Sequence, residues 1–258
     1  MKKEFEKSIE KTYNSIRKQF RSIRIDSLEV AKQVEEYRQF WKPNKINVIL
    51  LAESHVYTDQ KDYDTKLNKF ILNRIIPDYP TRFVRFVYCL GYGENKLLTR
   101  KRTDRKNPGT PQYWKIFSSC VSESEDNLGF NRILKTRTPN FFLRLRNKVE
   151  ILQKMKEKGI WLLDASIVGL YGGGSKRYDI IKKILEICWK SHIANIIEKS
   201  SPRHIIVIGK RVASVLNPKI QKFDIPFTVI PQPQARGTGE WQLENYKHYQ
   251  RICSKILI

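Results

Sequence analysis

Three acids and one amide are the side chains of this sequence best suited to chemistry, namely Glu53, Asp59, Asp164 and Gln232. A carboxylate can hold and activate a water molecule and can stabilise positive charge on a substrate. An amide can donate a neutral hydrogen bond to a substrate oxygen, which a carboxylate cannot do. The three acids are also the residues from which a metal-binding cluster would be built.

Each of these side chains lies at or after the end of an apolar run typical of a buried strand. Strands are expected at 46–51, 82–90, 160–164, 204–209 and 226–230, and helices at 65–76, 112–121, 142–158, 178–198, 210–216 and 241–257. This alternation predicts an α/β fold of three layers, in which helices cover both faces of a central, mostly parallel sheet. Ligands of such sheets bind outside the carboxyl ends of the strands, so the four side chains are expected at one rim.

Two helices are expected before the first strand, at 4–24 and 27–40, with Asp26 as the cap of the second and Glu29 completing a capping box. The apolar stripe of the first helix is expected to pack on the protein. The predicted organisation is therefore a helical extension at 1–43 and an α/β domain at 44–258.

The charge balance points to a polyanionic partner. The 258 residues carry 49 Lys and Arg against 26 Asp and Glu, a formal net charge of +23. A composition of 40% hydrophobic residues excludes a disordered basic tail. Nucleic acid is the first candidate partner and an anionic membrane surface the second, whereas a small acidic metabolite would need only a few cations.

The cysteines and the amino terminus add exclusions. The four cysteines, Cys89, Cys120, Cys188 and Cys253, form no CxxC pair of the kind that binds zinc or exchanges disulfides, and buried thiols are expected. The charged start lacks an apolar signal region, and no run is long enough to span a membrane. A cytoplasmic, monomeric protein without metal or cofactor is predicted.

Four segments together resemble the uracil-DNA glycosylase superfamily, over residues 45–257. Ala52-Glu53-Ser54-His55 stands where the family has a motif of glycine with an acid or amide. The stretch 156–164 is similar to a helix, turn and strand that end in a base-reading amide, and 205–210 to an apolar strand ending in glycine. The loop 231–236 stands where a His-Pro-Ser loop enters the minor groove. Three positions depart from the pattern: His55 replaces a proline, Gln232 a histidine and Asp164 the amide.

The resemblance implies a monofunctional DNA glycosylase, which cleaves the bond between a flipped base and its sugar. Glu53, with Asp59 as the alternative, would stabilise the sugar cation and orient water, and Gln232 would support the departing base. Asp164 would accept from the N4 amino group of cytosine and repel O4 of uracil. Because removing ordinary cytosine would destroy the host genome, a modified cytosine is expected, such as the glucosylated hydroxymethylcytosine of phage DNA. Bacterial anti-phage glycosylases are what the chain most resembles.

The resemblance also implies contacts to the flipped base and to double-stranded DNA. Val56 leaves room for a substituent on the base, and Tyr57 is the neighbouring alternative for that position. Phe86 offers an aromatic face, although alternating aromatic residues in a strand more often belong to the core. The expected DNA contacts are Arg236 as a wedge with Gly237 behind it, Lys176 and Arg177 after the glycine run 172–174, Lys210, Arg211, Arg100 and Arg102.

Three rival interpretations stay open. A non-catalytic, basic nucleic-acid-binding protein would keep the fold without the chemistry. A metal-dependent nuclease would use Glu53, Asp59 and Asp164 as a carboxylate cluster. A repair glycosylase would remove uracil. Local roles are also open, because Glu53 can be a loop acid in solvent and Asp164 a helix cap.

Overall fold

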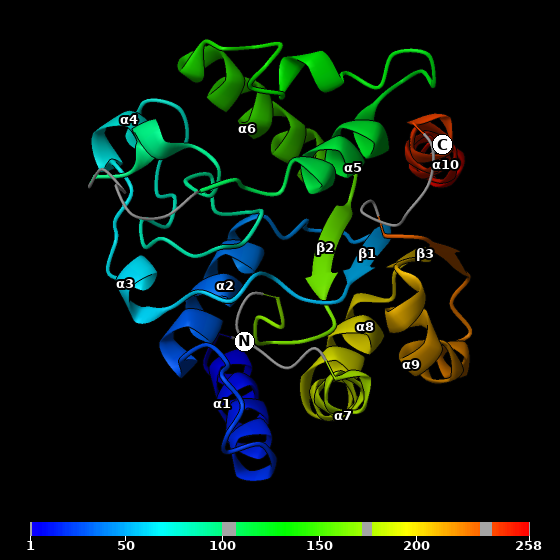
Figure 1. The fold of residues 1–258 in the computed structure, drawn as a ribbon. Coiled ribbons are helices and arrows are strands. Elements are labelled where there is room, and N and C mark those ends of the chain that lie inside the picture. Colours follow the sequence, from blue (N-terminus) through cyan, green and yellow to red (C-terminus); the bar gives the residue numbers. More distant parts are fainter. Residues whose placement is uncertain (1, 100–106, 172–176, 233–238, 258) are drawn as a thin grey trace.

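Four parallel strands form one sheet in the computed structural model, in the order β2-β1-β3-β4 (Figure 1). The structure describes residues 2–99, 107–171, 177–232 and 239–257. The strands are β1 (Val48–Ala52), β2 (Ile160–Asp164), β3 (His204–Ile208) and β4 (Phe227–Ile230). Their apolar runs are buried on both faces, which is the pattern of a covered parallel sheet.

Helices cover both faces of this sheet, which confirms the predicted three-layer α/β fold. Figure 1 shows α5 (Pro111–Val121), α6 (Phe141–Glu157) and α10 (Gly239–Ile256) on one side. The other side carries α7 (Tyr178–Cys188), α8 (Ala194–Ser200) and α9 (Lys210–Ile220), with α1 (Lys2–Gln19) beside α7. α6 packs on β2, and α9 packs on β3 and β4. None of the helices in the described part of the chain is long and apolar enough to cross a membrane.

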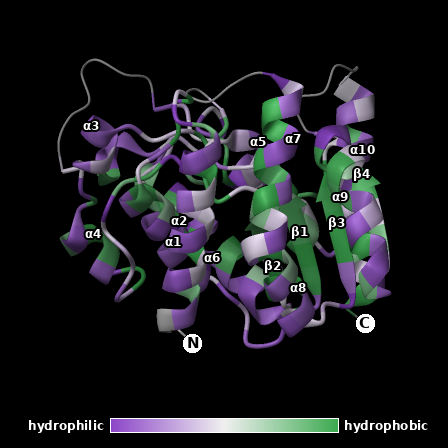
Figure 2. Cartoon of the chain, turned by 90° about the horizontal axis from the view of Figure 1, so that it is seen from below, coloured by the Kyte–Doolittle hydropathy of each residue, from purple (hydrophilic) through white to green (hydrophobic). Residues whose placement is uncertain are grey.

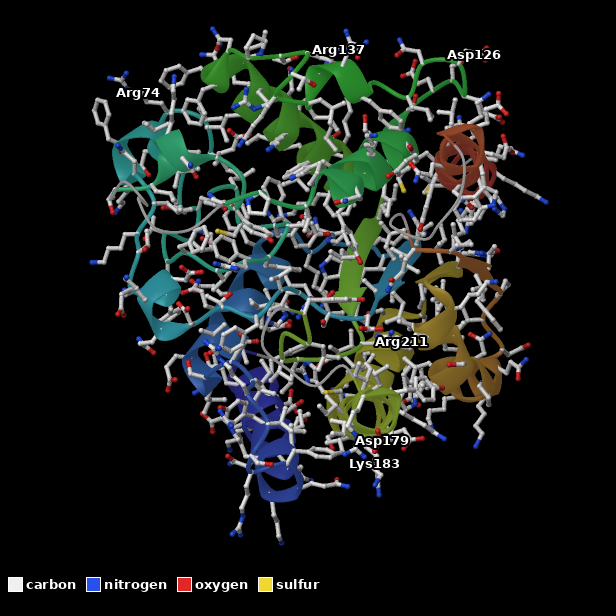
Figure 3. All side chains as sticks on the ribbon, in the orientation of Figure 1. Arg74, Asp126, Arg137, Asp179, Lys183 and Arg211 are labelled. Atoms are coloured by element: carbon white, nitrogen blue, oxygen red, sulfur yellow. The ribbon has the colours of Figure 1, made fainter. Side chains whose placement is uncertain are left out.

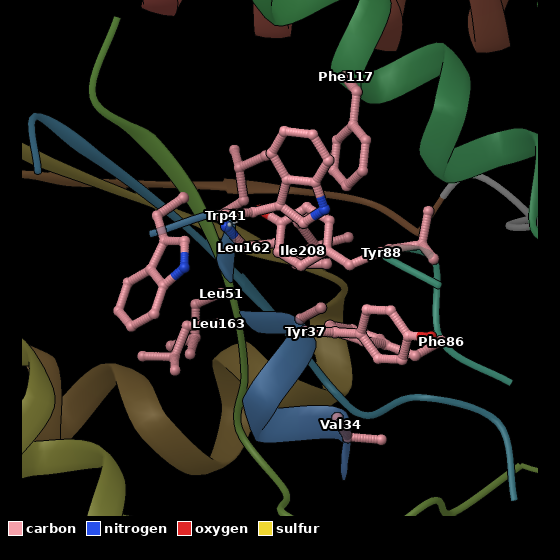
Figure 4. Close-up of a cluster of buried hydrophobic side chains, with 14 of the residues drawn as sticks. Val34, Tyr37, Trp41, Leu51, Phe86, Tyr88, Phe117, Leu162, Leu163 and Ile208 are labelled. Carbon is pink, nitrogen blue, oxygen red and sulfur yellow. Dashed lines mark hydrogen bonds between the residues drawn. The ribbon is translucent and has the colours of Figure 1, made fainter. Parts of the chain in front are cut away.

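The amino-terminal helices share the hydrophobic core with the sheet. The apolar stripe of α1 is buried through Ile9 and Ile16, as predicted. α2 (Leu28–Phe40) lies beside the β2 edge, where the indole of Trp161 donates to the Arg38 carbonyl at 3.0 Å. Figure 4 shows aromatic side chains of this region gathered with strand residues, and Figure 2 shows hydrophobic strands behind helices of mixed character. The four cysteines are buried free thiols.

The strand expected at 82–90 is wrong, because this segment is a buried loop over the β2 edge. Tyrosine hydroxyls take the place of a neighbouring strand. Tyr88 accepts from the Leu162 amide of β2 at 2.9 Å, and Tyr79 accepts from the Leu90 amide at 2.9 Å. The apolar residues are therefore buried without a β-ladder of their own.

Three expected helices also differ from the structure. The helix at 65–76 shrinks to α4 (Lys69–Asn73), because Leu67 forms an isolated bridge to Leu98 instead. The helix at 178–198 is divided by a π-helical segment, Trp189–Ile193. The expected Asp26 cap is wrong: Ser27 caps α2 by accepting from the Val30 amide at 3.3 Å. α3 (Gln60–Tyr63) and three short 3-10 helices, Asn95–Leu97, Phe130–Arg132 and Gln221–Phe223, complete the described elements.

Candidate functional site

The site lies at the carboxyl end of the sheet, where the chain changes direction between strands. β1 has β2 on one side and β3 on the other, so a crevice is expected between the ends of β1 and β3. Glu53 follows β1, Asp164 ends β2 and Gly209 follows β3. Figure 3 labels Arg211, from the first turn of α9, near the arrowhead of β2. The expected rim is therefore present.

Two loops leave this rim side by side and bring an unexpected tyrosine to Glu53. The Ser166 amide donates to the Glu53 carbonyl at 3.0 Å, and Ser54 Oγ accepts from the Leu170 amide at 3.1 Å. The Tyr57 amide then donates to the Tyr171 carbonyl at 2.7 Å. These bonds fix the backbone of Tyr171 next to the loop that carries Glu53.

A cavity of about 400 Å³ opens between these loops, the buried segment 85–92 and the start of α5. This volume lies in the usual range for small-molecule pockets, about 300–1,000 Å³. The side chains that matter for chemistry in its lining are His55, Val56, Phe86, Asp164, Tyr171 and Gln232. The cavity thus joins four predicted site residues with two that were not predicted as site residues.

One group of lining residues belongs to a buried ion cluster, made of Asp26, Arg38, His55 and Asp164. Arg38 Nη2 lies 3.1 Å from Asp164 Oδ2, and Arg38 also pairs with Glu35. His55 Nε2 lies 2.9 Å from Asp26 Oδ2, while His55 Nδ1 lies 3.6 Å from Asp164 Oδ2. All four side chains are almost completely buried. Each charge is therefore balanced by a neighbour of opposite sign.

The ion cluster keeps His55 protonated at neutral pH. Burial by itself lowers the pKa of His55, but the carboxylates of Asp26 and Asp164 outweigh it and raise the pKa to about 9. The ring also meets Phe86 edge-on, with centroids 6.1 Å apart. The imidazolium is thus completely buried, next to Asp164, which belongs to the cavity lining.

Asp26 is the residue that fixes this arrangement. Its carboxylate accepts from the Thr58 amide at 2.6 Å and from the Gly169 amide, in addition to His55. A Cβ on Gly169 would lie 2.6 Å from the Tyr57 nitrogen, so only glycine allows this approach. One side chain from the link between α1 and α2 therefore ties both rim loops together.

The second group, called the Glu53 group, consists of Glu53, Tyr171, Arg211 and Gln232. Glu53 is almost fully buried and, like Asp59, is not among the residues that line the cavity. Within the described residues neither of its oxygens has a partner at ordinary hydrogen-bond length, although the Tyr171 hydroxyl is near enough to affect its pKa. Arg211 Nη1 lies 3.5 Å from Glu53 Oε1. Burial raises the pKa of Glu53, and Arg211 and Tyr171 offset part of that rise. This carboxylate has kept its acceptor capacity.

Tyr171 connects Glu53 to Gln232. Gln232 Nε2 donates to the Tyr171 hydroxyl at 2.9 Å. Burial, followed by the neighbouring Glu53, raises the pKa of Tyr171 to about 12, so the hydroxyl stays protonated. Gly209 lets Gln232 come close: its φ is +100°, and a Cβ there would lie 2.6 Å from Gln232 Cγ. Gln232 is thus positioned by two neighbours.

Other predicted residues take local roles. Asp59 caps α3 by accepting from the Asp62 amide at 2.9 Å and is not among the residues that line the cavity. Tyr57 also lies outside the lining, with the Arg24 guanidinium 4.7 Å from its ring centroid. The carboxylate cluster of a nuclease is not assembled, since in the described ranges no group of three or more His, Cys, Asp or Glu side chains is arranged to hold a metal ion.

The predicted DNA contacts are only partly described. Lys210 and Arg211 are exposed in the first turn of α9. Arg177 pairs with Asp179 at 2.9 Å on the surface. Arg100, Arg102, Lys176, Arg236 and Gly237, together with the glycine run 172–174, lie outside the described residues.

The site residues missed by the sequence reasoning are Asp26, Arg38, His55 and Tyr171. Arg38 carried a signal, because it stands four residues after Val34 and three before Trp41 on the apolar face of α2. A charge in such a stripe needs a buried partner. Tyr171 and Asp26 carried no comparable signal, since their roles depend on loops that meet only in the fold.

No protein-family model matches the chain, and no significant similarity to a curated protein is found. The chemistry of the site therefore has to be inferred from its own geometry.

Proposed function

We propose that this chain is a monofunctional DNA glycosylase that flips a modified cytosine into the cavity and hydrolyses the bond to its sugar. The observation that carries the proposal is Glu53, a buried carboxylate without a partner at ordinary hydrogen-bond length in the described chain, in the same group as two cavity-lining side chains. A buried charge of this kind is costly, and such costs concentrate at functional sites.

Glu53 suits the sugar side of the reaction. As the bond to the base breaks, the sugar becomes a cation, which a nearby carboxylate stabilises. The same carboxylate accepts a proton from the attacking water. Asp59, the alternative for this role, caps α3 instead. No lysine is assigned as a covalent nucleophile, so strand cleavage by the enzyme is not expected.

Asp164 suits the base side. Arg38 and His55 both approach Oδ2, so within the described residues Oδ1 remains available as an acceptor. A carboxylate accepts from the N4 amino group of cytosine, whereas it repels O4 of uracil. Phe86 belongs to the same lining, although its ring is buried and the Arg38 guanidinium lies 5.3 Å from the ring centroid.

A second cavity supports a base larger than cytosine. It has a volume of about 210 Å³ and shares Tyr92, Thr110 and Pro111 with the main cavity. Trp114 and Lys148 also line it. Together with Val56 in the main lining, it offers room and polar groups for a substituent such as a glucosylated hydroxymethyl group, which makes phage DNA a candidate substrate.

The charge supports DNA as the partner. The net charge is +23, and α9 presents Lys210 and Arg211 together with its amino-terminal dipole at the rim. Binding to duplex DNA should weaken steeply as salt is raised.

One assay tests the proposal. Purified protein is incubated in EDTA with duplexes that contain cytosine, hydroxymethylcytosine, glucosylated hydroxymethylcytosine or uracil, and abasic sites are measured. Abasic sites from a cytosine-type base are expected. Release of uracil alone would overturn the base assignment. DNA binding without abasic sites on any duplex would overturn the proposed glycosylase activity and favour a non-catalytic nucleic-acid-binding protein.

A further inference from the structure

We propose that the link between α1 and α2, residues 20–27, is part of the DNA-binding surface, and that Arg24 in this link binds a backbone phosphate beside the cavity. The inference rests on the proposed function, because it takes DNA as the partner. It gives the amino-terminal segment, which was expected only to pack on the protein, a direct contact with the substrate.

The link is tied to the two loops that border the cavity. Asp26 accepts from the Thr58 amide and from the Gly169 amide, one in each loop. The loops pair with each other next to these bonds, since Val56 and Tyr171 form a parallel bridge and both line the cavity. The link therefore lies directly beside the site.

Arg24 extends over the first of these loops. Its guanidinium lies 4.7 Å from the ring centroid of Tyr57, the residue that follows Val56 of the lining. The Tyr57 amide donates to the Tyr171 carbonyl at 2.7 Å, and Tyr171, which lines the cavity, is 39% exposed. A guanidinium stacked on a ring keeps its N–H edge free, and this edge forms paired hydrogen bonds with phosphate.

One side chain of α1 holds the backbone on both sides of Arg24. Arg17 donates to the Ile23 carbonyl at 3.3 Å and to the Ile25 carbonyl at 3.4 Å. Its Nε donates to the Tyr13 hydroxyl at 3.1 Å. A cation that is already positioned loses less freedom when it binds, so this brace favours a specific contact.

The charge of Arg24 has no counterion in the described part of the chain. The side chain is exposed, and no acid of the described residues forms an ion pair with it. Arg211, also exposed, belongs to the same rim. A base that turns into the cavity leaves its phosphates at the rim, where such cations neutralise them.

The test compares Arg24→Ala with Arg74→Ala in binding to an unmodified duplex over a range of salt concentrations. Arg74 is the matched control, because its guanidinium also stacks on a ring, 4.1 Å from the centroid of Phe70, and Figure 3 shows it well away from Arg211. We expect Arg24→Ala to weaken binding about tenfold at low salt and to reduce the slope of log affinity against log salt by about 1. Arg74→Ala should change neither, and urea denaturation checks the folding of both variants.

Two further measurements define the contact. Arg24→Lys keeps the charge, so it should keep the slope while losing part of the affinity. A neutral methylphosphonate, placed in turn at each phosphate near an abasic site, should find one position where it weakens binding of the wild-type protein but not of Arg24→Ala.

Equal slopes in Arg24→Ala and the wild-type protein, equal losses in Arg24→Ala and Arg74→Ala, or no such phosphate would overturn the assignment of Arg24. A loss confined to vesicles of anionic phosphatidylserine would also overturn it and favour a membrane surface. A wild-type protein that binds the duplex but releases no base would overturn the glycosylase and leave the contact of Arg24 in place. A wild-type protein that does not bind DNA would overturn both.

Discussion

Two carboxylates, Asp164 and Glu53, are almost equally buried but differ in the charged groups around them. Asp164 is 2% exposed and lies against Arg38 and His55, whereas Glu53 is 1% exposed and, among the described cations, pairs with Arg211, itself 42% exposed in its side chain. The pKa of Glu53 is raised by its burial. The difference suggests a division of work, in which the ion cluster holds a fixed recognition surface and the Glu53 group keeps a reactive acid available.

The difference also explains what the amino-terminal helices contribute. Asp26 and Arg38, which complete the ion cluster, both come from residues before β1. The Glu53 group takes all its members from loops and helices that follow the strands. Variants in the ion cluster should therefore mainly lose stability, and variants in the Glu53 group should mainly lose reaction rate.

The largest effect is expected from breaking the ion cluster. Arg38→Met removes the cation that the buried carboxylates of Glu35 and Asp164 share, and should lower the free energy of unfolding by about 3–5 kcal/mol. Urea denaturation at pH 7 measures it. Arg132→Met, which removes a surface pair with Glu150, is the matched control and should cost less than about 1 kcal/mol. Similar losses of unfolding free energy in the two variants would show that the ion cluster stabilises the fold no more than a surface ion pair does.

Stability should also depend on pH through His55. Its folded-state pKa of about 9 lies above the ordinary value of 6.5, so its contribution is complete below pH 6.5 and is lost as pH rises through about 9. The loss should amount to about 3 kcal/mol. Urea denaturation from pH 6 to 10 should show this slope in the wild-type protein and a flatter one in His55→Gln. Parallel slopes would contradict it.

A smaller effect is expected where Gln232 is positioned. Gly209→Ala places a methyl group 2.6 Å from Gln232 Cγ at a φ of +100°, and should cost about 1–3 kcal/mol and slow base release. Gly239→Ala is the matched control, because a Cβ there meets no atom of the described residues within 4 Å. Thermal unfolding and single-turnover rates measure both. A wild-type rate of base release in Gly209→Ala would show that the position of Gln232 does not matter for the reaction.

The smallest effect is expected from Tyr171→Phe, which removes one hydroxyl from the Glu53 group. Losing its bond with Gln232 should cost about 1 kcal/mol, equivalent to roughly a fivefold slower reaction. Tyr171 lowers the pKa of Glu53, so the acid limb of the pH–rate profile should move to higher pH in the variant. The pH–rate profile from pH 4 to 8 measures this shift. An unchanged acid limb would show that Tyr171 does not affect the pKa of Glu53.

The strands and the rim could be predicted because alternating apolar runs and turns are local signals. Glu53 and Asp164 at the strand ends follow from the same pattern. The ion cluster could not be predicted, since Asp26 and Asp164 are brought together by packing between distant segments. The run 82–90 misled for a related reason: it is apolar because it is buried, while tyrosine hydroxyls from elsewhere satisfy its backbone.

Glu53→Gln tests the central claim most directly, by single-turnover release of a cytosine-type base together with urea denaturation. Because burial penalises the charged form of Glu53, the neutral amide should leave stability within about 1 kcal/mol of wild type or raise it. The rate should fall about 100- to 10,000-fold on every base that the protein accepts, with base preference and DNA affinity unchanged. A variant that keeps the wild-type rate would contradict the account.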